Sequence, residues 1–509
     1  MKILRLLCGL VCFLLPAMAW AGLSLHPLIS DHAVFQRDVP IRVMGKADAG
    51  GEVVVRWKDT DFKTKAEADG KWSVNLDPSP ADEKGQTLEV TCGTNSVQVL
   101  DILIGEVWLA SGQSNMQWPL RSCIVQSAEA EQAADPLLRL AEVLRSCAFE
   151  PAESASTQWK EATKEGALSF SAVAYFFGRE LRKDLKVPVG IVCSAVGGTP
   201  AEAWTPIDFL KADPDFAKAL QYRDEYPNEY TQLLEKYEQK RAAYEAAVVE
   251  AEKTQAKPPK KPGAPYPPNK NPNLASVLWN GMVHPLMLYP IRGVIWYQGE
   301  ANATRAGVYQ KLLTGMIGAW RKAWEIGDFP FLIVQLADFN CYVEGEMGTT
   351  WAKLRDAQSG VADTVPNTGL AVILGLGEPE DIHPQRKKEV GERLALLARK
   401  IAYDEDVDGC GPIFESVDYS GSEAKVTFRD VAGSLKTSDQ KEAGGFALAG
   451  ADKQFKPAQA RLDEDQVILK SAEVPIPAYV RYAWCNRPVD ANLTDESNLP
   501  ARPFRTDEY

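Results

Sequence analysis

Short segments in which apolar and polar residues alternate dominate the chain from residue 22 to about residue 100. Residues 52–57 (Glu-Val-Val-Val-Arg-Trp) and 71–74 (Lys-Trp-Ser-Val) are two such segments, and turns rich in Gly, Pro and Asp separate them. Alternation with a period of two is typical of strands that bury one face. The pattern therefore predicts an N-terminal β-sandwich domain over residues 22–100.

After residue 100 the apolar residues form continuous runs instead. These runs cover residues 102–104, 107–109, 189–193, 293–297, 331–334 and 370–374. Continuous runs are typical of strands that are covered on both faces. Between them, apolar residues recur at helical spacing, as at Val173, Phe176, Phe177 and Leu181. Strands that alternate with helices predict the α/β class, with a parallel sheet flanked by helices over residues 101–404.

An insert over about residues 213–273 interrupts this pattern. Residues 228–252 have a helical pattern, and residues 257–272 contain seven prolines in sixteen positions. We expect a helix followed by a stiff polyproline-type connection. From residue 405 to residue 509 short strand patterns return, which predicts a C-terminal β domain packed beside the first.

The first 21 residues are typical of a signal peptide. Lys2 and Arg5 precede an apolar run over residues 6–15, and Ala19-Trp20-Ala21 is a small-x-small cleavage site. The run is shorter than the ~20 residues needed to span a bilayer. We predict cleavage after Ala21 and a secreted or periplasmic protein without a membrane span.

Charge and cysteine spacing exclude several classes of function. The 509 residues include 56 Lys and Arg against 69 Asp and Glu, for a net charge of −13. Nucleic-acid binding requires a basic surface, so it is not expected. The nine cysteines contain no C-x-x-C pair, so no zinc-knuckle spacing is present.

Ser114 is the strongest candidate nucleophile. It lies in Ser111-Gly112-Gln113-Ser114-Asn115-Met116, directly after a predicted buried strand. A serine between the end of a strand and the start of a helix presents its hydroxyl to the crevice where ligands bind. The helix N-terminus also offers N–H groups to an oxyanion. Met116 replaces the second glycine of a G-x-S-x-G motif, which argues against an α/β-hydrolase elbow.

A serine nucleophile needs a base, and His383 is the best placed histidine. The four histidines are His26, His32, His284 and His383. His383 follows the predicted strand at residues 370–374 through a loop, and Asp381 precedes it by two positions. A carboxylate there would orient the imidazole and stabilise the imidazolium. We predict that Ser114, His383 and Asp381 act together in acyl transfer.

Two further loops follow predicted strands, Val196-Gly197-Gly198-Thr199 and Gln298-Gly299-Glu300. Backbone N–H groups beside glycine, and the Gln298 amide, are candidate donors to an oxyanion. Four strand ends then direct Ser, Gly-Gly, Gln-Gly-Glu and Asp-x-His toward one crevice, as acyl transfer requires.

Several of these segments together resemble the sialate O-acetylesterase family, a carbohydrate-esterase branch of the SGNH (GDSL-like) hydrolases. The segments are Gly105-Glu106-Val107-Trp108, residues 111–116, Gly197-Gly198-Thr199-Pro200-Ala201-Glu202-Ala203-Trp204, Trp296-Tyr297-Gln298-Gly299-Glu300, Asp381-Ile382-His383-Pro384 and residues 499–506. The resemblance covers most of the chain from about residue 23. It implies an SGNH-like domain, with Ser114 as nucleophile, His383 as base, Asp381 as its partner, and an oxyanion hole of Ser114 N–H, Gly198 N–H and the Gln298 side chain.

The chain departs from the pattern of the wider superfamily at two positions. An Asn usually occupies the role given to Gln298, and the Asp usually stands three residues before the His, whereas Asp381 stands two before it. Asp338 and Asp356 are therefore alternative acids.

Four residues near these motifs are candidates for supporting roles or for substrate binding. They are Asn115, Trp118, Arg121 and Glu300. Glu300 would hold the Gln298 loop or bind sugar hydroxyls, and Trp118 would stack on a sugar ring or pack in the core. Arg121 would pair with a sialic acid carboxylate or be an ordinary surface charge.

The sequence thus predicts a secreted serine esterase that acts without metal or cofactor. It would remove O-acetyl groups from sialic acid through an acetyl-Ser114 intermediate. An esterase for acetylxylan or another acetylated polysaccharide is the nearest alternative. A non-catalytic carbohydrate-binding protein is an alternative from a different class.

Overall fold

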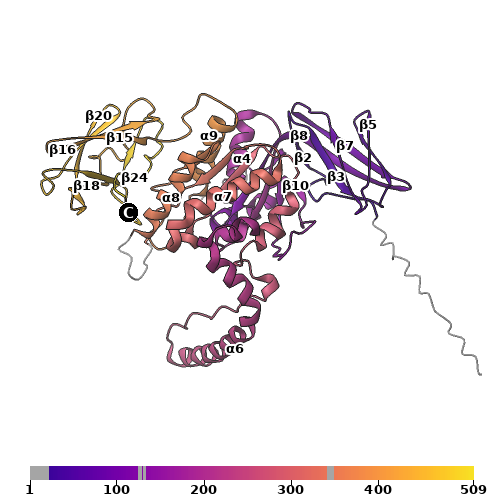
Figure 1. The fold of residues 1–509 in the computed structure, drawn as a ribbon, viewed down its shortest axis with the longest axis horizontal. Helices are drawn as coiled ribbons and strands as arrows, with labels where there is room; N and C mark the ends of the chain where they lie inside the picture. Colours follow the sequence, from indigo (N-terminus) through magenta and orange to yellow (C-terminus); the bar gives the residue numbers. More distant parts are fainter. Residues whose placement is uncertain (1–21, 124–128, 130–132, 341–348, 509) are drawn as a thin grey trace, which may run out of the picture.

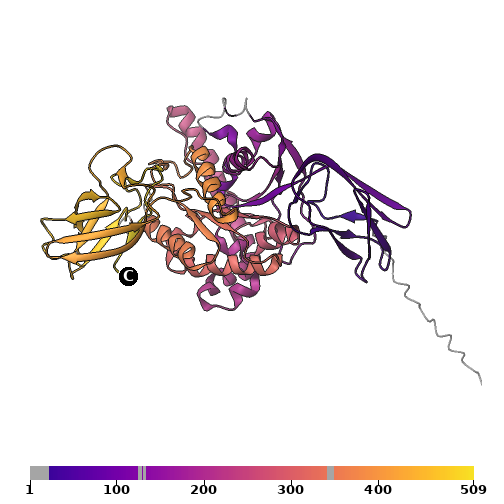
Figure 2. The ribbon, with the colours of Figure 1, turned by 90° about the horizontal axis from the view of Figure 1, so that it is seen from above.

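The computed structural model describes residues 22–123, 129, 133–340 and 349–508. The predicted signal peptide, residues 1–21, lies outside them. Three parts follow one another along the longest axis of the molecule, with a β part at each end and an α/β part between them (Figures 1 and 2). The two β parts therefore do not pack side by side as expected, because the α/β part separates them. No helix in the described ranges is long and apolar enough to cross a bilayer.

The N-terminal part contains strands from two sheets, one of which is ordered β1-β3-β6. In the other, β2 and β7 pair with β8, β4 pairs with β7, and β5 pairs with β4. Its strands are β1 (Ser24–Leu25), β2 (Val34–Gln36), β3 (Ile41–Lys46), β4 (Glu52–Trp57), β5 (Thr60–Lys65), β6 (Lys71–Leu76) and β7 (Asp82–Cys92). In β4 the alternate residues Val53, Val55 and Trp57 are buried while Glu52 and Arg56 are exposed. The predicted alternation thus has its expected cause, the burial of one face.

Strand β8 (Asn95–Gly112) belongs to both the N-terminal part and the central part. Its first half pairs with β7, and residues 106–112 pair in parallel with β11. The predicted boundary between residues 100 and 101 therefore lies inside one continuous strand.

The central sheet has the strand order β10-β9-β11-β8-β12-β13-β14. Its other strands are β9 (Asp135–Glu142), β10 (Trp159–Ala162), β11 (Val189–Ala195), β12 (Gly293–Tyr297), β13 (Phe331–Val334) and β14 (Thr368–Ala371). All neighbouring pairs from β9 to β14 are parallel, whereas β10 is antiparallel to β9. Every residue of β11, β12 and β13 is buried, which explains their continuous apolar runs.

Helices cover both faces of this sheet, so the predicted mixed α/β architecture is confirmed. The helices of the central part are α1 (Ser114–Gln117), α3 (Lys164–Ser169), α4 (Ala172–Leu185), α5 (Ile207–Lys211), α7 (Ala306–Trp324), α8 (Thr350–Thr364) and α9 (Lys387–Ala402). Short 3-10 or π turns are η1 (Leu120–Ser122), η2 (Ala201–Trp204), η3 (Pro214–Phe216), η4 (Pro268–Lys270), η5 (Trp279–Val283), η6 (His284–Leu286) and η7 (Glu300–Arg305). Apolar residues of α4 and α9 join one core cluster, and those of α7 and α8 join the other.

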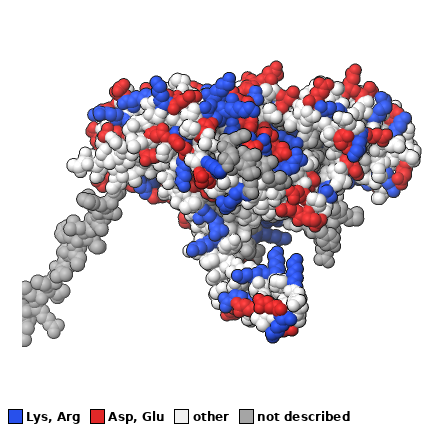
Figure 3. Space-filling model, turned by 180° about the vertical axis from the view of Figure 1, so that it is seen from behind, with Lys and Arg blue, Asp and Glu red and all other residues white. Residues whose placement is uncertain are grey.

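The insert forms the long helix α6 (Ala217–Thr254), which projects away from the body, and a proline-rich segment that returns along it (Figure 1). Tyr230, Leu233, Tyr237 and Tyr244, which the sequence places on one helix face, are half-buried although most of α6 is exposed. Lysine, arginine and acidic side chains are interspersed over this segment and over the body (Figure 3).

The C-terminal part is a second β assembly. Its strands are β15 (Ile413–Ser420), β16 (Glu423–Arg429), β17 (Lys436–Thr437), β18 (Phe446–Ala449), β19 (Lys456–Pro457), β20 (Gln459–Asp463), β21 (Gln466–Lys470), β22 (Tyr479–Tyr482), β23 (Leu493–Thr494) and β24 (Phe504–Arg505). They form sheets ordered β15-β16-β21-β20 and β19-β18-β22-β24, with the small pair β17-β23.

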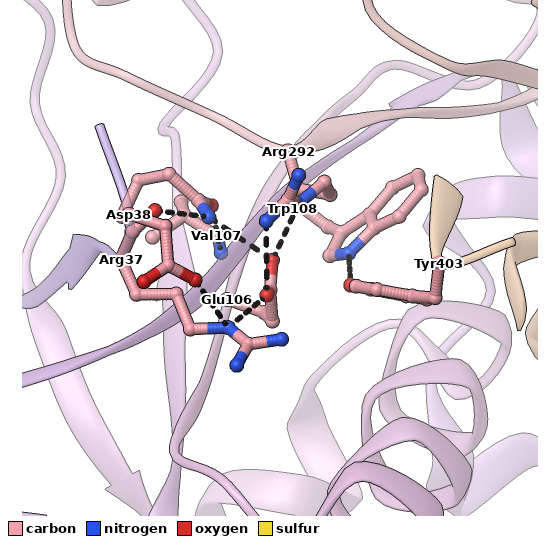
Figure 4. A network of polar contacts seen from close by, with 8 residues as sticks. Arg37, Asp38, Glu106, Val107, Trp108, Arg292 and Tyr403 are labelled. Atoms are coloured by element: carbon pink, nitrogen blue, oxygen red, sulfur yellow. Dashed lines mark hydrogen bonds and ion pairs between the residues drawn. The ribbon is translucent and has the colours of Figure 1, made fainter. Parts of the chain in front are cut away.

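A buried carboxylate joins the N-terminal and central parts (Figure 4). Glu106 on β8 is fully buried and accepts hydrogen bonds from Gln36 at 3.0 Å and from Arg292 at 2.9 Å. Arg37, which follows β2, donates to the same carboxylate. A buried charge is tolerated only when it is paired, so this network holds the loop after β2 and the segment before β12 against β8.

The described cysteines are all free thiols. They are Cys92, Cys123, Cys147, Cys193, Cys410 and Cys485. Because none of them pairs with another, the described part of the fold is held together without a disulfide bond.

Candidate active site

Ser114 is placed at the carboxyl end of β8 by a sharp turn at Gly112. Gly112 has a φ of +137°, and a Cβ there would lie 2.2 Å from the carbonyl oxygen of Tyr297. Only glycine fits this close approach of two strands. The chain then enters α1, and the Gln113 carbonyl accepts the N–H groups of Met116 and Gln117. Ser114 is therefore the first helical residue, whose N–H has no acceptor within the helix.

His383 reaches Ser114 from the loop between β14 and α9. Its Nε2 lies 2.9 Å from Ser114 Oγ, which is within hydrogen-bond distance. These two residues are 269 positions apart in the chain. The structure thus brings together the predicted nucleophile and the predicted base.

The imidazole of His383 is held by Trp118. The two rings stack with centroids 4.6 Å apart and an interplanar angle of 14°. Of the two roles considered for Trp118, packing is the one observed here, and it packs against the base itself. Burial lowers the pKa of His383 below its ordinary value of 6.5, nearby Lys387 lowers it further, and Asp381 opposes this shift. The imidazole is therefore neutral near pH 7, as a general base must be.

Asp381 contacts His383 mainly through the backbone. Its Oδ1 accepts the His383 backbone N–H at 2.8 Å and lies 3.5 Å from the ring Nδ1. The first contact is an Asx-type turn, which orients the residue two positions on. The second is an ion-pair distance rather than a short hydrogen bond. Asp381 is in place to orient His383, and its side chain is 43% exposed.

The alternative acids have other partners. Asp338 accepts the backbone N–H groups of Gly375 and Gly377, at 2.9 and 3.1 Å, and so holds the loop after β14. Asp356 forms an ion pair with Arg505 of the C-terminal part at 3.2 Å. Asp381 is therefore the carboxylate that contacts His383.

The glycine loop after β11 lies against Ser114. A Cβ at Gly197 would lie 3.2 Å from Ser114 Cβ, and the Gly197 N–H donates to the Gln117 side chain at 2.9 Å. Gly198 has a φ of +75° and open space where its Cβ would be. The Gly198 N–H donates no hydrogen bond within the described part of the chain. It is therefore available, together with the Ser114 N–H, to bind an oxyanion.

Gln298 does not offer the donor that we predicted. Its side chain is fully buried, and its Nε2 donates to the Thr199 carbonyl at 3.1 Å and to Asn302 Oδ1 at 2.8 Å. Its Oε1 accepts the Tyr309 hydroxyl at 2.9 Å. A primary amide has two N–H groups, and both are already used. In this structure Gln298 instead ties β12 to the glycine loop that follows β11.

Asn115, the residue after Ser114, forms hydrogen bonds with Glu300 and with Lys387, a residue that the sequence analysis did not identify. Asn115 Nδ2 donates to Glu300 Oε1 and to the Ile382 carbonyl, the latter at 3.0 Å. The ammonium of Lys387 donates to Asn115 Oδ1. Burial lowers the pKa of Lys387 to about 7, and burial also raises the pKa of Glu300. A lysine at the start of a helix gives no sequence signal for such a contact.

Comparisons with known proteins find relatives that match most of this chain. Residues 104–257 and 276–400 match the family described as carbohydrate esterase, sialic acid-specific acetylesterase. A sialate O-acetylesterase from Rattus norvegicus is 30% identical over 96% of this chain and 94% of its own length. One from Homo sapiens is 30% identical over 81% of this chain and 78% of its own.

The chain belongs to the sialic acid-specific acetylesterase family.

A solved structure of another carbohydrate acetylesterase supports the same family assignment. A carbohydrate acetylesterase from Xanthomonas citri is 36% identical and superimposes with a TM-score of 0.82, covering 96% of this chain and 100% of that one. The protein is therefore an ester hydrolase of the carbohydrate acetylesterase type, which sets aside the alternative of a non-catalytic binding protein. The two matched segments of the esterase contain Ser114, Gly198, Gln298 and His383, and the proline-rich return of the insert falls between them.

Two further features of the esterase are candidates for binding. Arg121, on η1, is exposed and forms no ion pair within the described residues. His32, Asp101 and Glu161 have ligand atoms within 4.8 Å of one another, the geometry of a possible cation site. However, Arg139 donates to Asp101 at 2.6 Å and places a positive charge there. Asp101 also lies far from Ser114 along β8, so this group takes no part in the ester site.

Proposed function

We propose that the protein is a serine esterase that removes O-acetyl groups from sialic acid through an acetyl-Ser114 intermediate, with the SGNH type of active site. The observation that carries the proposal is the 2.9 Å contact between His383 Nε2 and Ser114 Oγ. It is made where three parallel strands end, and the lowered pKa of His383 keeps the base neutral.

The reaction would proceed in two halves. His383 Nε2 takes the proton of Ser114 Oγ as that oxygen bonds to the acetyl carbonyl carbon, and the N–H groups of Ser114 and Gly198 bind the resulting oxyanion. The C–O bond to the sugar then breaks, and the sugar oxygen takes the proton from His383. In the second half His383 takes a proton from water, whose oxygen attacks the acetyl group. Acetate leaves and Ser114 recovers its proton.

The sialic acid specificity rests on the family and on its named relatives. Sialic acid carries a carboxylate, so its recognition would require a basic group near the site. Arg121 is exposed on η1, shortly after α1, and we propose that it pairs with the carboxylate of sialic acid. We also propose that the chain is exported after cleavage behind Ala21, so that it meets extracellular or periplasmic sugars.

Release of acetate from O-acetylated sialic acid and from acetylated xylan, measured with equal acetyl concentrations, tests the proposal. We expect turnover of the sialic acid substrate, loss of at least about 10³-fold in Ser114→Ala, and unchanged turnover in Ser169→Ala, which removes an exposed serine. Preference for xylan would overturn the substrate, and undiminished activity of Ser114→Ala would overturn the mechanism. N-terminal sequencing of the exported protein should begin at Gly22.

A further inference from the structure

Lys387 is a fully buried lysine in a position that disfavours its charged form. It is the first residue of α9 and has an exposed fraction of 0%. Burying an ammonium costs free energy, and a positive charge at a helix N-terminus opposes the helix dipole. Both effects disfavour lysine here, so the contacts of its ammonium must compensate for them.

The ammonium of Lys387 contacts the Asn115 side-chain amide, which lies between the segments that carry Ser114 and His383. Lys387 donates to Asn115 Oδ1, while Asn115 Nδ2 donates to Glu300 and to the carbonyl of Ile382. Asn115 directly follows Ser114, and Ile382 directly precedes His383. The Asn115 side chain therefore connects the helix that carries the nucleophile to the loop that carries the base.

The ammonium determines which way round this amide lies. An ammonium has donors only, so it can pair with the Oδ1 side of Asn115 and not with the Nδ2 side. With Oδ1 directed to Lys387, Nδ2 is directed to Glu300 and Ile382. Glu300 Oε2 is buried and has no hydrogen-bond partner among the described residues. The Glu300 carboxylate therefore depends on Asn115 for its side-chain contact.

We propose that Lys387 is a positioning residue of the esterase, which sets the orientation of the Asn115 amide and thereby holds the His383 loop against Ser114. This inference deepens the proposed function and rests on the roles given there to Ser114 and His383. A purely structural lysine would stabilise the fold without changing the reactivity of Ser114.

The charge of Lys387 also acts on the base. The groups that face its ammonium are the Tyr297 ring at 5.3 Å, Glu300, Cys123, and Glu378, Asp381 and His383 of the preceding loop. Lys387 lowers the pKa of His383. Removing the positive charge therefore raises that pKa. Because the base must be neutral, activity is then lost at a higher pH than in the unmodified protein.

The test is Lys387→Met, compared with Lys388→Met as the matched control. Lys388 is the next residue of α9, is partly exposed and pairs with Glu129. With p-nitrophenyl acetate we expect Lys387→Met to lower kcat by about 100-fold with little change in KM, and to move the acid limb of kcat/KM to higher pH. Lys388→Met should match the unmodified protein. Unchanged kcat and an unchanged acid limb in Lys387→Met would overturn the proposal.

A double-mutant cycle with Asn115→Ala shows whether Lys387 acts through that amide. If it does, Lys387→Met lowers kcat far less when Asn115 is already absent, so the two effects are strongly non-additive. Fully additive effects would contradict the proposed contact. Should Lys387→Met fail to fold, Lys387→Gln keeps an N–H donor while removing the charge. It should retain kcat within about tenfold of the unmodified protein and still show the raised acid limb, whereas an unshifted limb would count against the proposal.

Labelling of Ser114 by a fluorophosphonate separates this inference from the proposed function. The rate of labelling, followed by intact mass, depends on the Ser114–His383 pair and needs no sugar. If the protein does not deacetylate sialic acid but Lys387→Met still slows labelling, only the substrate proposal fails. If sialic acid is deacetylated and Lys387→Met labels at the normal rate, only the role of Lys387 fails.

Discussion

Asp381→Asn separates the charge of the proposed triad carboxylate from the hydrogen bond that it makes within its own loop. Asparagine has nearly the same shape, and its side-chain oxygen can still accept the His383 backbone N–H that Asp381 accepts at 2.8 Å. The substitution therefore keeps the turn and removes only the negative charge that lies 3.5 Å from His383 Nδ1.

The loss of activity should be modest. Two unit charges at this distance attract by about 5 kcal/mol at an effective dielectric constant of ~20 and by about 1 kcal/mol in water. Because the Asp381 side chain is 43% exposed, solvent screening brings the value close to the lower figure. About 1–2 kcal/mol of lost transition-state stabilisation corresponds to a decrease in kcat of about 5- to 30-fold. A well-buried triad aspartate typically contributes about 10⁴-fold.

The assay is kcat/KM for p-nitrophenyl acetate as a function of pH. Asp381 raises the pKa of His383, so its neutralisation lowers that pKa and moves the acid limb to lower pH. Glu380→Gln removes a charge from the neighbouring position and serves as the matched control. A loss above about 10³-fold, or an acid limb that moves to higher pH, would refute the reasoning.

Three further predictions concern the base, the interior and the turn before the nucleophile. Because burial lowers the pKa of His383, the acid limb of kcat/KM should have its midpoint below pH 6.5, and a midpoint above 6.5 would contradict the burial argument. Glu106→Gln leaves two arginines without their carboxylate and should lower the free energy of unfolding by about 3 kcal/mol in urea denaturation, whereas Asp61→Asn, which breaks an exposed pair with Arg56, should leave the free energy of unfolding nearly unchanged. Gly112→Ala places a methyl group 2.2 Å from a carbonyl oxygen and should abolish turnover or folding, while Gly318→Ala, at an open position on α7, should be tolerated by both measures.

Local pattern was sufficient to predict most of the elements. Continuous apolar runs mark the central strands because those strands are buried on both faces, and the alternating run at residues 52–57 marks a strand with one buried face. The same logic placed Ser114 and His383 at strand ends. Parallel strands end at one edge of a sheet, which is why residues 269 positions apart were expected to meet.

Other features depended on neighbours that no local pattern reveals. β8 continues through the predicted domain boundary because its two halves pair with different sheets. The C-terminal β part packs away from the N-terminal one, although their strand patterns are alike.

The amino-acid sequence by itself was enough to predict the strands, the helices and the candidate residues for ester chemistry, because burial and backbone geometry repeat over short distances along a chain. The tertiary structure alone decided how the polar groups pair. Gln298 cannot act as the predicted oxyanion donor, because Thr199 and Asn302 accept both of its N–H groups. Lys387 has a proposed positioning role, because its ammonium donates a hydrogen bond to Asn115. A hydrogen bond is defined by atoms a few ångströms apart, and only the folded chain brings those atoms together.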